Sequence, residues 1–343
     1  MSRQKMHSAS EPVQSTPMAQ PETMRLLVAY DGSAHAQAAI AMVEDLFRPC
    51  VMGQQCSLTT LTVLPTQYIG GHEALQQSLE AVKGRLELQA LPVEALIKAG
   101  NPAATINSLA EEIDANLILI GAQGLRATLG ILLGGVAQQV VEYSHCPVLV
   151  VRAPYNGIQH VLLVVDGSPY SQRAVEYLAP VCPGEEVESM PRIHELPKPA
   201  KEADTVRKRC SWLPHAANAT LMHVLPPPIS PDVAARAWTL GPEVLYPAPA
   251  SPLDVAAMEA DEIRQGQRVL NQARNVLEAA GLAVDEQLVR GDSATEIIQY
   301  AQHNAVDLIV CGSRGLSPVT SWLLGSVSRK LVHYANCSVL IVK

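Results

Sequence analysis

Two glycine-rich segments, one near the middle of the chain and one near its end, have the spacing of a phosphate-binding loop. The later segment holds Gly312, Gly315, Gly325 and Ser326. Glycines let the backbone turn tightly and come close to a ligand. Free N–H groups at a helix N-terminus, together with the helix dipole, attract phosphate, and the Ser326 hydroxyl adds a donor. The pattern predicts a site for the phosphates of a nucleotide.

An Asp-Gly-Ser triplet follows a short apolar run in each half of the chain, at Asp31 and at Asp166. An aspartate there can accept hydrogen bonds from a ribose hydroxyl or a base amine. Arg314 supplies a cation for the phosphates. Taken singly, the glycines would be explained by tight turns and Ser326 by an ordinary N-cap. Taken together, these residues favour a nucleotide site.

The elements that must position these residues alternate between strand and helix. In the second half we expect strands near 160–165, 219–225, 284–289, 307–311 and 338–342, and helices near 169–180, 255–280, 293–304 and 325–335. Such alternation is typical of βαβ units and a parallel sheet. In a doubly wound sheet, ligands bind at the carboxyl ends of the strands, where Asp166, Val224 and Gly312 fall. The amphipathic helix that ends near Ala280 should stop at Gly281.

The chain also repeats itself. Residues 25–40 are similar to 160–175, and residues 98–135 are similar to 289–326. We therefore expect a disordered polar tail over 1–23, a first α/β domain over 24–153 and a second over 154–343.

Two insertions lengthen the second copy, near 183–213 and near 226–256. Thirteen of the 25 prolines lie between Pro183 and Pro252. Proline fixes φ and removes a hydrogen-bond donor, so we expect these insertions to be extended loops.

Composition argues against several functional classes. The 343 residues include 25 basic and 33 acidic residues, giving a net charge of −8, which argues against general nucleic-acid binding. One Phe and three Trp offer no platform for stacking bases. No apolar run approaches the ~20 residues of a membrane helix. Seven scattered cysteines without a C-x-x-C pair indicate a reduced, cytoplasmic protein.

On these residues the chain resembles the universal stress proteins, in a tandem two-domain form, over about residues 24–153 and 158–343 without the insertions. That family's ATP-binding loop reads G-x-x-G-x₉-G-[ST], which the later glycine segment matches in full. The resemblance implies two Rossmann-like, adenine nucleotide alpha hydrolase-like domains. It also implies that Asp166 contacts the nucleoside and that Val224 contacts adenine through its backbone. The expected site comprises Val165, Asp166, Val224, Gly312, Arg314, Gly315, Gly325, Ser326 and Val327.

The first half departs from the family's loop. Gly135 stands where the family has Ser or Thr, and Gln123 replaces the basic residue. One hydrogen bond to a charged group is worth about 1.5–3 kcal/mol, or about tenfold or more in affinity. We predict a weaker or empty site built from Asp31, Val63, Gly121, Gly124, Gly134 and Gly135.

The leading prediction is a cytosolic stress-response protein that binds ATP, alone or with Mg²⁺, as a regulatory ligand. The sequence has no G-x-x-x-x-G-K-[ST] and no H-E-x-x-H, and no Walker lysine or general base lies near the loop. At most slow hydrolysis is therefore expected. Two alternatives stay open: a nucleotide-independent protein-binding scaffold, and an adenylating or ATP-pyrophosphatase enzyme, whose usual Ser-Gly-Gly loop is absent.

Assembly is expected to involve the last strand of each half. Residues 148–151 and 339–342 resemble the strands through which these proteins dimerise, and exposed edge strands are normally paired or covered. We expect them to pair antiparallel as an intrachain pseudo-dimer. A further homodimer and an unknown protein partner stay open, whereas nucleic acid and membrane are not expected partners.

Overall fold

The structure is a computed structural model that describes residues 24–47, 56–64, 72–88, 91–124, 133–179, 217–228, 252–316 and 324–343. The predicted tail and the first predicted insertion lie outside these residues. Of the second predicted insertion, only its two ends are described.

Strands and helices alternate along both halves. The first half contains β1 (Met24–Ala29), α1 (Ala34–Leu46), β2 (Cys56–Leu64), α2 (His72–Glu87), β3 (Val93–Ala99), α3 (Pro102–Glu112), β4 (Leu117–Gly121), α4 (Gly135–Tyr143) and β5 (Val148–Val151). The second contains β6 (His160–Val164), α5 (Pro169–Leu178), β7 (Asn218–Leu225), α7 (Pro252–Ala279), β8 (Val284–Arg290), α8 (Ser293–His303), β9 (Leu308–Gly312), α9 (Ser326–Tyr334) and β10 (Ser338–Val342). The elements predicted for the second half are confirmed to within three residues at each end.

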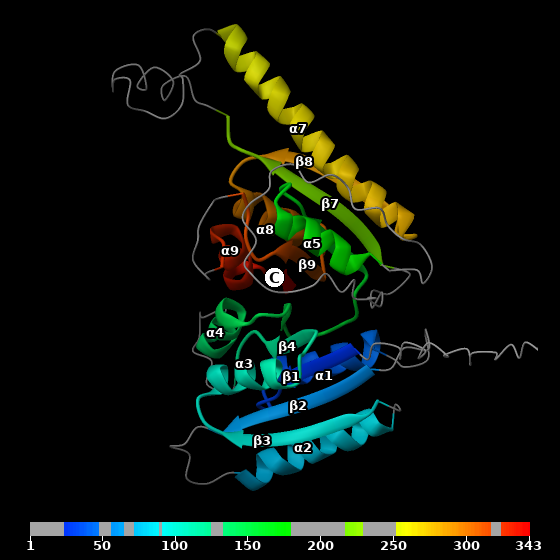
Figure 1. Cartoon of the computed structure of the whole chain (residues 1–343), viewed down its shortest axis with the longest axis vertical. Coiled ribbons are helices and arrows are strands. Elements are labelled where there is room, and N and C mark those ends of the chain that lie inside the picture. Colours follow the sequence, from blue (N-terminus) through cyan, green and yellow to red (C-terminus); the bar gives the residue numbers. More distant parts are fainter. Residues whose placement is uncertain are drawn as a thin grey trace, which may run out of the picture.

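One ten-stranded sheet runs through the molecule, in the order β3-β2-β1-β4-β5-β10-β9-β6-β7-β8 (Figure 1). Within each half all pairings are parallel, and the order 3-2-1-4-5 repeats as 8-7-6-9-10. This confirms two doubly wound units. In each unit the order reverses beside the first strand, which is the switch point where such sheets bind ligands.

The two halves meet where β5 pairs antiparallel with β10, with Val339 opposite Val150 and Ile341 opposite Val148. The predicted antiparallel pairing of the last strands is thereby confirmed. Each half covers an edge of the other, so the outer edges of the sheet are β3 and β8.

The core consists of two layers, one on each face of the sheet. Leu26 and Val28 of β1 belong to the same buried cluster as residues of α1 and α5, whereas Leu27 belongs to the cluster on the other face, with residues of α3 and α4. This alternation follows from the two-residue period of a strand. Both layers run without a break from the first half into the second.

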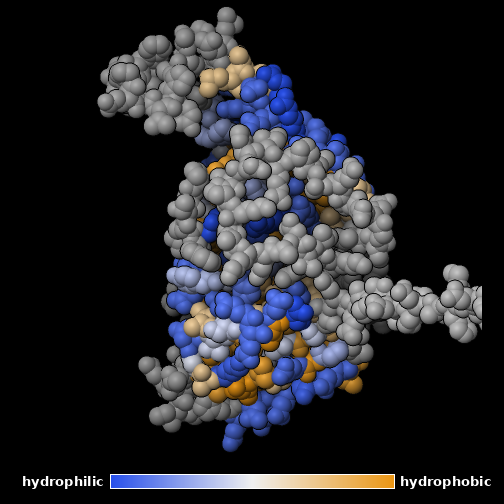
Figure 2. All heavy atoms as spheres, in the orientation of Figure 1, coloured by the Kyte–Doolittle hydropathy of each residue, from blue (hydrophilic) through white to orange (hydrophobic). Residues whose placement is uncertain are grey.

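The long helix α7 begins at Pro252, three residues before the predicted start and inside the predicted insertion. Leu270 and Leu277 of α7 are buried, whereas Ile263, seven residues before Leu270 and therefore on the same face, is 47% exposed. Near that end α7 extends past the sheet (Figure 1), and its outer surface is hydrophilic (Figure 2). The helix stops as predicted, with Gly281 at φ +82°. None of the helices that the structure describes is long and apolar enough to cross a membrane.

Candidate functional site

The Asp-Gly-Ser segment after β6 forms a turn that starts α5. One carboxylate oxygen of Asp166, Oδ1, accepts a hydrogen bond from the Ser168 N–H at 2.9 Å. Ser168 is fully buried, and its hydroxyl accepts from the Ser171 N–H at 3.1 Å. Serine therefore caps the helix, while aspartate holds a fixed, half-buried carboxylate at the end of the strand.

Gly315 lies against the other oxygen of that carboxylate. A Cβ added at Gly315 would lie 2.7 Å from Oδ2 of Asp166. A hydrogen bond also joins the loop after β6 to the loop after β9, because the Ser168 hydroxyl donates to the Arg314 carbonyl at 3.4 Å. The loops after β6 and β9 therefore meet at the switch point, and any side chain at position 315 would force the Asp166 carboxylate to shift.

Gly312 has a different role. A Cβ there would lie 2.6 Å from the carbonyl carbon of Tyr170 and 2.8 Å from the Ser171 nitrogen. The sequence pattern places Gly312 in the phosphate-binding loop, but the space beside its Cα is filled by the first turn of α5. Packing of α5 on β9 explains this glycine, and its place in a nucleotide site stays a prediction.

Helix α9 begins on glycine and has no side-chain cap. Gly325 occupies the N-cap position in an extended conformation, and Ser326 is the first helical residue, with an exposed side chain. The alternative that Ser326 is an ordinary N-cap is therefore wrong. The first turn of α9 is hydrogen-bonded to the end of β9, because the buried Ser328 hydroxyl donates to the Gly312 carbonyl at 2.8 Å. The Gly325 N–H donates to the Ser313 carbonyl, also at 2.8 Å.

Two cations gather on Tyr170, at the start of α5. The guanidinium carbons of Arg314 and Arg173 each lie 5.4 Å from the centre of the Tyr170 ring. Arg314 also donates from Nη1 to the Tyr170 hydroxyl at 3.2 Å. Stacking on an aromatic ring orients a guanidinium, so the loop carries a positioned positive charge in an acidic protein.

The ends of β6 and β7 are joined beside the Asp166 turn. The N–H of the buried Val165 donates to the Met222 carbonyl at 2.9 Å. The Val165 carbonyl lies 2.7 Å from Nδ1 of His223, and since a carbonyl only accepts, Nδ1 carries the proton. The next residue, Val224, is half-buried at the strand end and packs against the core.

The structure brings the predicted residues of the second half to neighbouring strand ends. Val165 and Asp166 follow β6, and Val224 is the second-last residue of β7. Gly312 ends β9, and the residues that follow it contact Gly325. Val327 is half-buried and packs on the core in the first turn of α9.

Sequence reasoning missed three side chains of this region. Ser168 carried a recognisable signal, because serine is a preferred N-cap residue. Tyr170 and Ser328 carried none, since their partners in the β9 loop, Arg314 and Gly312, lie 144 and 16 residues away in the chain.

This paired architecture and its loops correspond to one known family. The family model described as the Universal stress protein family matches residues 22–152 and 201–343. The chain belongs to the universal stress protein family. The two matches confirm the tandem arrangement, and the fold is the Rossmann-like fold of these proteins.

Curated universal stress proteins are similar to parts of this chain. YxiE of Bacillus subtilis is 38% identical over 88 residues, which cover 24% of this chain and 60% of YxiE. MJ0531 of Methanocaldococcus jannaschii is 34% identical over 79 residues, 23% of this chain and 46% of MJ0531. The chain thus spans about half the length of these relatives. A Thermus aquaticus universal stress protein is 36% identical over 135 residues, 37% of this chain and 97% of that protein.

Among solved structures, a universal stress protein from Archaeoglobus fulgidus superimposes on the whole arrangement. The TM-score is 0.56 at 19% identity, covering 93% of this chain and 98% of that one. At this identity the likeness supports the fold alone.

The first half of this universal stress protein builds the same turn as the second. Asp31 Oδ1 accepts from the Ser33 N–H at 3.0 Å, and Ser33 caps α1 by accepting from the Ala36 N–H at 3.2 Å. The Ser33 hydroxyl donates to the Gln123 carbonyl at 3.1 Å. A Cβ at Gly124 would lie 2.6 Å from Oδ2 of Asp31.

Other predicted residues of the first half also occupy equivalent places. Gly121 lies against α1, where a Cβ would be 2.8 Å from Cβ of His35. Val63 is half-buried near the end of β2. Gly134 is the N-cap of α4, again without a side-chain cap, and Gly135 is exposed, with no atom within 4 Å of an added Cβ.

The two halves differ in the side chains around this shared backbone. His35 and Gln123 occupy the positions of Tyr170 and Arg314. His35 faces the segment that links the halves, because its Nδ1 accepts a hydrogen bond from the Ala153 N–H at 2.9 Å. The first half therefore retains the turn and the helix terminus but lacks the arginine on tyrosine and the serine hydroxyl.

Proposed function

We propose that this universal stress protein binds ATP, with or without Mg²⁺ on its phosphates, at the switch point of the second half. The ligand acts as a regulatory signal in a stress response. Asp166 holds the ribose, the backbone of Val224 borders adenine, and the start of α9, with Ser326 and Arg314, holds the phosphates. Asp166 also faces the glycine loop, so the nucleoside and phosphate subsites adjoin.

The observation that carries this proposal is the uncapped start of α9 beside a fixed carboxylate. Six helices have described N-cap residues, and side chains cap four of them: Ser33 for α1, Asn101 for α3, Ser168 for α5 and Asp292 for α8. The two exceptions begin at Gly134 and Gly325, the two glycine loops. The first N–H groups of a helix need partners, and a phosphate supplies them.

Family membership supports an adenine nucleotide as the ligand class. One solved member is a universal stress protein in complex with cAMP, and another is an Arabidopsis thaliana family protein with AMP bound. The choice of ATP rests on the match of Gly312, Gly315, Gly325 and Ser326 to the ATP-binding sequence pattern of the family.

We propose no efficient catalysis at this site. Within the described residues, the carboxylate shown next to the loop is Asp166, and one oxygen is engaged by the Ser168 N–H. Hydrolysis needs a positioned water and stabilisation of the transferring phosphoryl group. We infer slow turnover at most, so that ATP shifts a conformational or partner equilibrium.

A cytosolic location and a protein partner complete the proposal. Cys146, Cys311 and Cys337 are buried, and burial raises the pKa of each thiol, to about 12 for Cys311. Such thiols are unreactive and pack as small apolar groups. They suit a reducing compartment.

Calorimetric titration of ATP into the full chain tests the proposal, with Gly325→Val as the disrupting variant. A Cβ at Gly325 would lie 3.2 Å from Cα of Arg314, so valine displaces the loop. Gly134→Val is the matched control in the first half. We expect one strong site that Gly325→Val removes and Gly134→Val retains. No binding to the native chain, and no nucleotide released on denaturation, would favour a nucleotide-independent scaffold.

A further inference from the structure

Two cations at equivalent positions cross the junction between the halves. Arg152 follows β5 and Lys343 follows β10, and each side chain reaches the last turn of the other half's loop helix. Arg152 Nη2 donates to the Val332 carbonyl of α9 at 2.8 Å, with the His333 carbonyl at 3.4 Å. Lys343 Nζ donates to the Val141 carbonyl of α4 at 2.5 Å. Each half therefore supplies a cation to the C-terminal end of a helix in the other.

The arginine contact is the more deeply buried of the two. Arg152 is 9% exposed, and burial lowers the pKa of its guanidinium. Its backbone N–H also donates to the Ser338 hydroxyl at 3.2 Å. Burying a guanidinium is costly unless hydrogen bonds compensate, so the two carbonyls at the end of α9 hold this side chain in a defined place.

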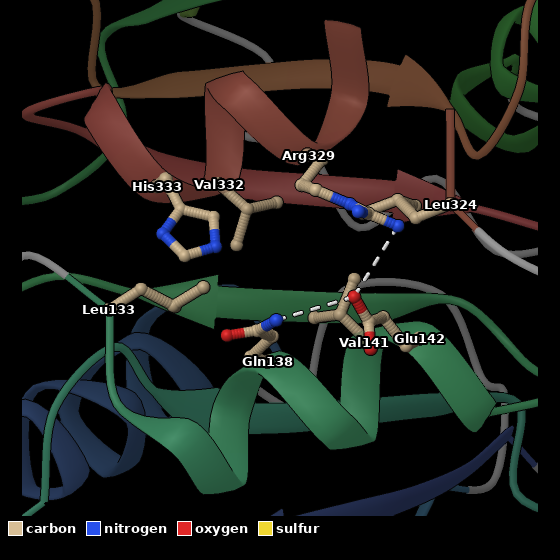
Figure 3. A pocket seen from close by; sticks show the side chains of 8 residues that line it. All are labelled: Leu133, Gln138, Val141, Glu142, Leu324, Arg329, Val332 and His333. Carbon is tan, nitrogen blue, oxygen red and sulfur yellow. Dashed lines mark hydrogen bonds and ion pairs between the residues drawn. The ribbon is translucent and has the colours of Figure 1, made fainter. Parts of the chain in front are cut away.

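The start of α9 also packs against the first half. Leu324, the residue before the Gly325 N-cap, is 8% exposed and lines a small pocket with Val141 and Glu142 of α4 (Figure 3). In the middle of α9, Arg329 forms an ion pair with Glu142 at 3.6 Å (Figure 3). The first half thus contacts α9 before its first turn, along its length and at its last turn.

These contacts make one short helix a link between two sites. Helix α9 has nine residues, about 14 Å at 1.5 Å per residue. An anion at its N-terminus and a cation at its C-terminus both interact favourably with the dipole. Over so short a rigid element, a shift at one end moves the other end as well.

We propose that Arg152 of the first half is a positioning residue for the nucleotide site of the second half, setting the place of α9 and hence the affinity for ATP. This inference rests on the proposed function. The first half then has a task that does not require nucleotide of its own: it holds the phosphate helix of its neighbour. By linkage, ATP must in turn tighten the contact between Arg152 and α9.

The test is ATP titration of the full chain carrying Arg152→Gln, Arg152→Lys or Glu142→Gln. We expect Arg152→Gln to weaken binding by about three- to tenfold and Arg152→Lys to restore part of the loss. Glu142→Gln removes an ion pair across the same junction but leaves the end of α9 capped, so we expect less than a twofold change. Equal losses for Arg152→Gln and Glu142→Gln, or no loss for Arg152→Gln, would overturn the proposal.

Hydrogen exchange on the native chain provides a second measurement that needs no variant. If the contact between Arg152 and α9 is coupled to ATP binding, saturating ATP slows hydrogen exchange in residues 148–153 of the first half as well as in α9. Protection confined to the second half would refute the link even if Arg152→Gln failed to fold. Absence of ATP binding to the native chain would instead refute the proposed function.

Discussion

Gly315 and Asp166 are in contact across the gap between two loops, because a Cβ at Gly315 would lie 2.7 Å from the Asp166 carboxylate. The size of the residue at position 315 therefore affects the orientation of Asp166, the residue predicted to bind the ribose. The first half repeats the relationship between Gly124 and Asp31, at 2.6 Å.

Gly315→Ala should weaken ATP binding by about tenfold, because the new methyl group displaces the carboxylate and one hydrogen bond to the nucleoside is worth about 1–2 kcal/mol. Calorimetric titration measures the change. Gly124→Ala makes the same substitution against Asp31 and should leave the strong site intact. Equal losses from the two variants would contradict the assignment of the strong site to the second half alone.

Exchanging the residues after the two N-cap glycines should exchange affinity between the halves. Gly135 has open space around an added Cβ, so Gly135→Ser places a hydroxyl at the start of α4 without a clash. We expect the first site to gain about tenfold, and Ser326→Gly to cost the second site a similar factor. Titration that resolves two sites measures both. No gain from Gly135→Ser would mean that Gln123 and His35, not the missing hydroxyl, weaken the first site.

Much of this fold could be predicted from the sequence because the signals are local. Apolar runs marked the strands, and the repeat showed that the second half copies the first. Gly281 ended α7 where a left-handed residue is needed. The start of α7 was predicted three residues too late, because Pro252 lies in the proline-rich segment that we expected to be an extended loop.

The site was predictable in its position but not in the roles of its residues. The sequence pattern treated Gly312 and Gly315 alike, yet one accommodates α5 and the other a carboxylate. Arg152 and Ser328 had no local signal, since their partners lie 180 and 16 residues away in the chain. Such roles depend on tertiary packing, which sequence spacing does not encode.

Gly312→Ala should reduce stability rather than affinity alone. The added methyl group would lie 2.6 Å from the Tyr170 backbone, and overpacking of this kind costs about 1–3 kcal/mol. Urea unfolding followed by circular dichroism measures the loss. Gly135→Ala, at a position with open space, is the control and should change stability little. Unchanged stability for Gly312→Ala would show that α5 does not rest on β9 as closely as the geometry requires.

Folding stability should fall as the pH is lowered through and below about 6.5, in part because of His35. Burial, followed by the nearby Arg152 charge, lowers the pKa of His35 from its usual 6.5, against the opposing influence of the Val151 carbonyl and Asp31. Between the folded-state pKa and 6.5 the unfolded chain therefore binds more protons, so stability rises with pH through that window and is fully present above it. Protonation would also remove the Nδ1 lone pair that accepts from the Ala153 N–H. The measurement is the urea midpoint between pH 5 and 8 for the native chain and for His35→Asn, which retains an acceptor but does not titrate. We expect a shallower pH dependence for the variant, and the same slope in both proteins would assign the effect to other groups.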